Sequence, residues 1–176
     1  MITANYVYLI SSLPTLQFGS KPPFTFEKLL ELSSRHISGE DMATLKRSSI
    51  SGDYARKETE PPVLKKWRDF DTALRNELVK IRASHKRLDP NKYLRPGEAA
   101  DLSIPHITLT AHRNPNILEG ERMLDETRWK FLSELEFSHY FDLEFLLIYA
   151  HKLLMLERWD RIGSADKNRM LEELLV

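Results

Sequence analysis

The stretch WRDFDTALRNELVKIRA, residues 67–83, decides the fold class of this chain. Its apolar residues recur at steps of three and four, which places them on one stripe of an α-helix that faces a core. The stripe consists of Val63, Trp67, Phe70, Leu74, Leu78 and Ile81. Arg75, Asn76 and Glu77 form a compact polar cluster between two of its leucines. We interpret this cluster as a contact surface for another protein.

Further helices are predicted on the N-terminal side of this stretch. Thr25 is expected to open one helix, and Gly39 is expected to end that helical region. Ser38, with an aspartate three residues later, resembles a second helix start. Residues 6–13 have the β-branched and aromatic content of a short strand and the length of a buried helix. Helix is favoured, because the segment stops abruptly before Pro14.

Loops are predicted on both sides of the long helix. Pro61 and Pro62 fit its first turn. Backbone N–H groups in the first turn of a helix have no partner within the helix, so the N–H that proline lacks is not missed there. The polar, glycine-containing residues at about 48–60 before them predict a flexible loop. Residues at about 89–114 contain three prolines and a glycine. They predict a connector with at most one or two turns of helix.

The C-terminal third of the chain is predicted to be helical. Nearly every residue from 114 to 161 suits a helix, with a break predicted at 138–142 and a stop at Gly163. A short final helix is predicted at 166–175. Residues 143–156 are apolar almost all round, which is typical of a central core helix or of a helix that a partner covers.

These patterns predict an all-α fold. A chain of 176 residues is long enough for one domain with a substantial core. We therefore predict a single helical domain over residues 1–176, a bundle of about six helices with two long antiparallel helices. A short N-terminal strand at 6–13 is the alternative left open.

The charge balance disfavours a nucleic-acid partner. Lysine plus arginine and aspartate plus glutamate number 26 each, without the basic excess of most nucleic-acid binders. The charges are unevenly placed. Residues 75–95 carry seven basic and two acidic residues, whereas residues 119–144 carry three basic and eight acidic ones. We interpret the two segments as solvated helix faces that partly neutralise each other.

Cysteine content and hydropathy indicate a cytoplasmic setting. The chain has no cysteine, which excludes disulfides and thiolate metal sites and fits a reducing compartment. Its longest apolar run, residues 145–150, is far shorter than the roughly 20 residues of a membrane span. The N-terminus also lacks a basic stretch followed by an apolar core. We expect a soluble protein that reaches a membrane only through its partners.

One histidine motif resembles half of a catalytic signature. His106 and Thr108 match one His-x-Thr of the two-histidine phosphoesterases, in which two imidazoles act as acid and base. The other candidate half, His36-x-Ser38, falls at the end of a predicted helix, whereas that chemistry needs two adjacent strands. We therefore interpret His106 and His112 as connector residues with ordinary hydrogen bonds.

A second motif resembles half of a metal site. Glu136 and His139 match one Glu-x-x-His pair of the helical di-iron signature, and the second pair is absent. Glu144 and His151 are spaced so that they would lie on the same helix face as this pair. A solvated acidic face explains the same pattern. The six glycines form no phosphate-binding or nucleophile motif. We predict no catalytic residue, metal or cofactor, with a metal-dependent or phosphoesterase-like enzyme as the disfavoured alternative.

Three segments together resemble a bacterial family whose genes lie in V/A-type ATPase operons. They are YVYLISSLPTLQFG at 6–19, PPFTFEKLL at 22–30 and FDTALRNELVKIRA at 70–83. That family looks like a divergent counterpart of the C subunit of V/A-type ATPases, which is the d subunit in eukaryotes. This C subunit is an all-helical socket that joins the central rotor shaft to the membrane ring. The resemblance covers the first half of the chain, and the chain is much shorter than the three-module funnel of the C subunit.

The resemblance implies a non-catalytic central-stalk component that binds the rotor shaft and the membrane ring. A stand-alone helical adaptor with no link to the ATPase is the alternative. A competing interpretation is that Tyr6, Tyr8 and Trp67 are ordinary core residues. The candidate partner-facing residues are Arg75, Asn76, Arg82, Tyr6 and Tyr8.

Overall fold

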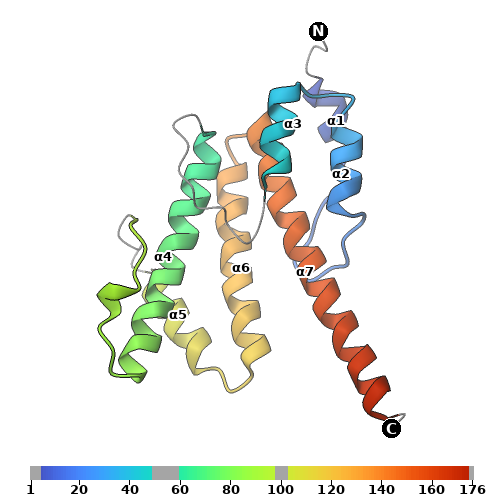
Figure 1. The fold of residues 1–176 in the computed structure, drawn as a ribbon. Helices are drawn as coiled ribbons and strands as arrows, with labels where there is room; N and C mark the ends of the chain where they lie inside the picture. The colour runs from blue at the N-terminus through green and yellow to red at the C-terminus, as the bar shows by residue number, and fades with distance from the viewer. Residues whose placement is uncertain (1–4, 49–59, 98–102, 175–176) are drawn as a thin grey trace. The chain divides into compact units, whose positions relative to one another are not determined.

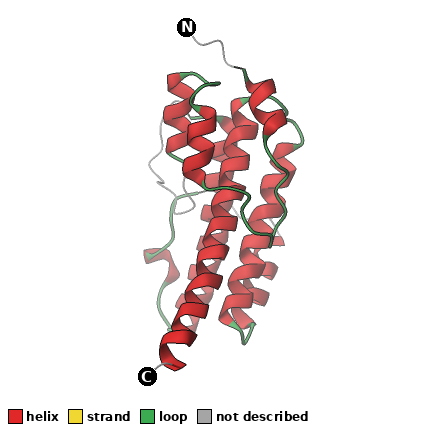
Figure 2. Ribbon diagram, turned by 90° about the vertical axis from the view of Figure 1, so that its right-hand side faces the viewer, coloured by secondary structure: helices red, strands yellow, loops and turns green. Residues whose placement is uncertain are grey.

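The computed structural model describes residues 5–48, 60–97 and 103–174, in which helices are joined by loops (Figures 1 and 2). They contain seven α-helices, one short 3-10 helix and no strand. The predicted all-α class is confirmed. The chain divides into two compact units, residues 1–55 with 135–176 (unit 1) and residues 56–134 (unit 2).

Three short helices begin unit 1. They are α1 (Tyr6–Ser12), α2 (Phe26–Ser33) and α3 (Gly39–Lys46). The N-terminal segment is thus a helix, and the alternative of a strand is wrong. Two features favour the helix: the Asn5 side chain accepts a hydrogen bond from the Tyr8 N–H at its start, and α1 buries Leu9 and Ile10.

Side-chain caps fix where α2 and α3 begin. Thr25 Oγ1 accepts from the Lys28 N–H at 3.3 Å, and Ser38 Oγ accepts from the Asp41 N–H at 3.1 Å. Both predicted starts are confirmed. The expectation that Gly39 ends the preceding helix is wrong, because α2 has already ended and Gly39 is the first residue of α3.

The long helix α7 (Leu143–Leu174) runs through unit 1 and contacts both α2 and α3. The predicted stop at Gly163 is wrong, and residues 166–174 continue α7 instead of forming a separate helix. A glycine inside a helix costs only about 1 kcal/mol relative to alanine, which the surrounding helix-forming residues offset. The apolar segment predicted as core is buried, namely at Leu146, Leu147, Ile148, Tyr149, Ala150, Leu153, Met155 and Leu156.

Unit 2 consists of α4 (Pro62–His85), η1 (Pro90–Lys92), α5 (Ser103–Arg113) and most of α6 (Ile117–Glu136). α4 begins at the predicted prolines. The predicted break at 138–142 is confirmed, since α6 ends at Glu136 and α7 begins at Leu143. Of the loop expected at 48–60, residues 49–59 lie outside the described ranges.

The connector expected at 89–114 is wrong in its second half, where α5 forms a helix of 11 residues. Pro105 lies in the first turn of this helix, where a missing N–H is tolerated. Ile104, Thr108 and Ala111 recur at steps of four and three and are all buried. Burial of this face therefore outweighs the loop-forming composition around it.

α4 and α6 are the two predicted antiparallel helices. Their opposite directions can be followed by colour in Figure 1. The Phe70 and Phe131 rings stack between them with centroids 4.0 Å apart. Trp67 is buried on α4, as its core interpretation predicts. The apolar core of the unit contains Ala73, Leu74, Leu78, Ile104, Ala111 and Leu124.

Candidate functional site

Two of the predicted partner-facing residues on α4 make contacts inside unit 2. Arg75 Nε donates to Asp71 Oδ2 at 2.7 Å. The Asn76 amide pairs with the backbone of Arg95, donating to its carbonyl and accepting from its N–H, each at 2.9 Å. Asn76 thereby ties the segment after η1 to α4. Arg82 is exposed near the end of α4, so it is the member of this group that is presented to solvent.

Beneath Arg75 lies a buried group of charges. Arg128 on α6 donates from Nε to Asp71 Oδ1 and from Nη1 to Asp125 Oδ1, each at 2.8 Å. Burial alone would lower the pKa of Arg128, but the two carboxylates outweigh it and raise this pKa, so the guanidinium stays charged. The arrangement is a satisfied ion network that links α4 to α6 and leaves no open ligand position at Arg128 Nε.

The two N-terminal tyrosines differ in their surroundings. The Tyr6 hydroxyl donates to Asp41 Oδ2 at 2.8 Å, and the Ser38 hydroxyl donates to the same oxygen at 2.7 Å. Burial and the Asp41 carboxylate raise the pKa of Tyr6 above its ordinary value. Tyr8 is 64% exposed, and its ring lies 5.2 Å from that of His36. Tyr6 thus joins α1 to α3, whereas Tyr8 is available at the surface.

A surface feature that was not predicted from the sequence lies between α6 and α7. Phe137, Tyr140 and Phe141, the aromatic turn, are 83%, 65% and 50% exposed. Turns at a protein surface are normally made of Gly, Pro, Asn, Asp and Ser. The signal was present in the sequence, as three aromatic residues within five positions at a predicted helix break, but aromatic residues next to helices are more often core.

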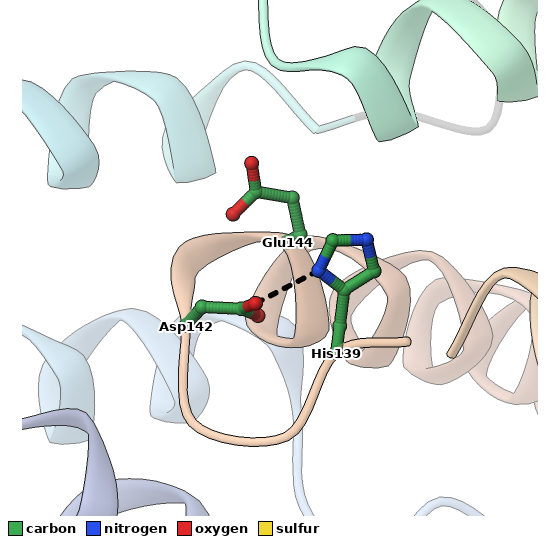
Figure 3. Close-up of side chains that lie close together, drawn as sticks. All are labelled: His139, Asp142 and Glu144. Carbon is green, nitrogen blue, oxygen red and sulfur yellow. Dashed lines mark hydrogen bonds and ion pairs between the residues drawn. The ribbon is translucent and has the colours of Figure 1, made fainter. Parts of the chain in front are cut away.

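The shape of this turn is set by polar groups and not by its aromatic residues. The His139 N–H donates to the Glu136 carbonyl at 3.0 Å, which closes α6. Asp142 Oδ1 accepts from the Phe145 N–H at 2.9 Å, which caps the start of α7. The His139 ring contacts Asp142 through Nδ1 and Oδ2 at 2.8 Å (Figure 3).

His139, Asp142 and Glu144 form the candidate metal cluster within the described ranges (Figure 3). One ligand atom from each lies within 4.8 Å of the others. Both Asp142 oxygens already hold the turn, one through the Phe145 N–H and the other through His139. We therefore interpret the group as a capped helix start.

The Glu136-x-x-His139 pair does not form the helical metal motif. Glu136 is the last residue of α6 and makes an ion pair with Lys152, whereas His139 lies in the turn. His151 is buried, with Nδ1 2.8 Å from the Leu147 carbonyl. The cluster that does form includes Asp142, three residues after His139, and these residues come together in the turn between α6 and α7 and not on one helix face.

The His-x-Thr motif also lacks the setting that its chemistry needs. His106 and Thr108 lie on α5, which corrects their assignment to a connector, and the Thr108 hydroxyl donates to the Ile104 carbonyl at 2.8 Å. No strand occurs in the part of the chain that the structure describes. His112, also on α5, lies beside His85 with ring centroids 5.0 Å apart.

A comparison with protein families matches part of the chain. Residues 102–175 match a family described as "Protein of unknown function (DUF2764)". This segment spans α5, α6 and α7, and it includes the aromatic turn. Searches of curated proteins and of solved structures found no significant match.

Proposed function

We propose that this chain is a non-catalytic component of a V/A-type ATPase, similar to the C subunit, that links the rotor shaft to the membrane ring. The observation that carries the proposal is the aromatic turn. Exposed aromatic residues gathered in one short segment are typical of protein contact surfaces, where Tyr and Phe are enriched. A coupling component needs such a surface and no catalytic group.

The resemblance to the family found in ATPase operons supports the same function. Its three segments lie in α1 and the loop that follows, in α2 and in α4. The family's expected all-helical architecture agrees with the helices of the described ranges. Among these helices none has the length and apolarity needed to cross a membrane. Attachment to the membrane ring would therefore be made through partner proteins.

The test is affinity purification of the tagged protein from mildly solubilised native membranes, with mass spectrometry of the co-eluting proteins. We expect the shaft and ring subunits in near-stoichiometric amounts, and an untagged strain is the control. Recovery of the protein alone would contradict stable membership in the ATPase. Stoichiometric recovery of a different complex would favour the stand-alone adaptor instead.

The disfavoured enzymatic alternative has its own measurement. Hydrolysis of a generic phosphodiester, or iron or manganese retained by the purified protein, would support it. We expect neither, because Thr108 is hydrogen-bonded within α5 and Asp142 is occupied at the start of α7.

A further inference from the structure

We propose that the aromatic turn is the docking site for a basic segment of a rotor protein, one that presents lysine or arginine beside apolar side chains. The identity of this partner rests on the proposed function, whereas the chemistry of the docking site comes from the turn itself. The turn residues that carry the proposal are Phe137, Tyr140 and Phe141, with acidic residues on both sides.

The aromatic side chains are not needed for the fold of the turn. Its backbone is held by Glu136, His139 and Asp142 through the hydrogen bonds that end α6 and begin α7. Phe137 leaves most of its ring in water, which costs free energy unless another surface covers it. A partner that removes this apolar area from water would gain that free energy on binding.

The charge around the turn indicates which partner would fit. Residues 131–151 contain four acidic residues and no lysine or arginine. Glu136 is paired with Lys152, and Asp142 holds His139. Glu134 and Glu144 make no ion pair within the described ranges. The exposed rings are thus flanked by carboxylates that are not neutralised, and a segment with positive charges is complementary to them.

Helix α1 approaches the acidic residues of this turn through Tyr6. Tyr6 lies close enough to Asp142 and Glu144 for their charges to contribute to its raised pKa. Val7 and Tyr8, the next two residues of α1, are both exposed. Successive residues of a helix point in different directions, so Tyr6 is the residue of α1 that lies near these carboxylates, and the docking surface is the turn itself.

A second copy of this chain is the main competing occupant. Residues 86–93 contain three basic residues, and Leu88 and Tyr93 among them are exposed. This segment has the chemistry that the aromatic turn would accept. We favour a rotor protein, because the chain is proposed to work as a link between two different components. The experiment must nevertheless distinguish the two occupants.

The deciding experiment is photo-crosslinking in the native host, with a photoreactive phenylalanine analogue in place of Phe137. The same analogue in place of Ile117, an equally exposed residue at the start of α6, is the matched control. We expect Phe137 to crosslink to a peptide of the shaft or ring that contains lysine or arginine, and Ile117 to give no such product. Glu134→Lys should reduce the yield about tenfold, because it places a positive charge beside the docked segment.

Each other outcome overturns a stated part of this inference. A crosslink to residues 86–93 of a second copy, recovered as a covalent dimer, would replace the rotor protein by that copy. A crosslink to a basic segment of a protein outside the ATPase would keep the docking chemistry and overturn the proposed function. No crosslinked protein, or a crosslinked peptide without basic residues, would overturn the docking site itself, even where affinity purification recovers the rotor.

Discussion

Arg128 on α6 and Asp71 on α4 are joined by a hydrogen-bonded ion pair of 2.8 Å between two side chains that are 8% and 4% exposed. Asp125 accepts a second hydrogen bond from the same guanidinium. Charged hydrogen bonds of this kind require one fixed alignment of donor and acceptors, whereas apolar side chains tolerate small shifts. The pair therefore specifies the register in which α4 and α6 pack.

Removing Arg128 should destabilise unit 2 strongly. Arg128→Met removes this guanidinium from buried Asp125 and leaves buried Asp71 with the partly exposed Arg75 as its ion-pair partner. The free energy of unfolding should fall by about 3–5 kcal/mol, which is the usual cost of breaking a buried pair by deleting one partner. Chemical denaturation measured by circular dichroism would determine it.

A matched control for this variant is Lys130→Met, two residues further along α6. It removes an exposed pair with Glu126, whose side chains are 70% and 48% exposed. Exposed pairs contribute about 0–1 kcal/mol, so this variant should unfold almost as the parent does. Equal losses in the two variants would show that Arg128 acts through its aliphatic packing and not through its charge.

Charge reversal should separate the two candidate arginines of α4. Arg75→Glu places a carboxylate beside buried Asp71 and should lower the melting temperature by several degrees, whatever happens to partner binding. Arg82→Glu is at an exposed position and should leave melting unchanged. Thermal unfolding of both variants checks this. If the Arg82→Glu protein no longer recovered the rotor proteins in affinity purification, Arg82 would be a contact residue. An unchanged melting temperature in Arg75→Glu would refute the role of Arg75 inside unit 2.

Local features of the fold could be predicted from the sequence because short-range chemistry determines them. The caps at Thr25 and Ser38 and the proline start of α4 depend on residues within one turn. The long helix α4 follows from its periodic stripe. Helix α5 could not be predicted in the same way, since burial against α4 outweighs the prolines and glycine near it.

The features of the candidate site depend on contacts between residues that are far apart in the sequence, and local sequence patterns do not predict such contacts. Asp71 and Arg128 are 57 residues apart, and each resembles an ordinary polar residue on a helix when considered alone. Residue spacing predicts a contact surface at Arg75 and Asn76. It does not reveal that the Arg75 side chain is hydrogen-bonded to Asp71 and the Asn76 side chain to the Arg95 backbone. The aromatic turn was visible in composition, but its exposure is a property of the folded chain.

Two glycines in helices should respond oppositely to the same substitution. A Cβ at Gly120 on α6 would lie 2.6 Å from the Ala111 carbonyl oxygen, a backbone atom that cannot rotate away. Gly120→Ala should therefore destabilise the protein. A Cβ at Gly163 on α7 would meet nothing within 4 Å. Gly163→Ala should stabilise it by about 0.5–1 kcal/mol, the usual gain of alanine over glycine inside a helix.

Denaturant midpoints of the two alanine variants measure this difference directly. Stabilisation by both would mean that α5 and α6 can separate slightly at Gly120 without loss. Destabilisation by Gly163→Ala would indicate that α7 needs a flexible point there, in line with the helix stop that its sequence predicts at this position.

Tyr6 should make stability depend on alkaline pH. Its hydroxyl donates to Asp41, and burial together with this carboxylate raises its pKa in the folded protein. A phenol in the unfolded chain titrates near 10. Since the folded pKa is the higher one, the contribution of Tyr6 to stability is complete below about pH 10 and is lost as pH rises toward the folded pKa.

The comparison of the parent with Tyr6→Phe over a pH series isolates this contribution. The variant should lose about 1.5–3 kcal/mol at neutral pH, the net value of a hydrogen bond to a charged acceptor. The difference between the two proteins should shrink above about pH 10. Asp41→Asn removes the negative charge beside the phenol, so ultraviolet titration should then find tyrosinate at lower pH than in the parent. A constant difference between parent and Tyr6→Phe across the alkaline range would refute the coupling between Tyr6 and Asp41.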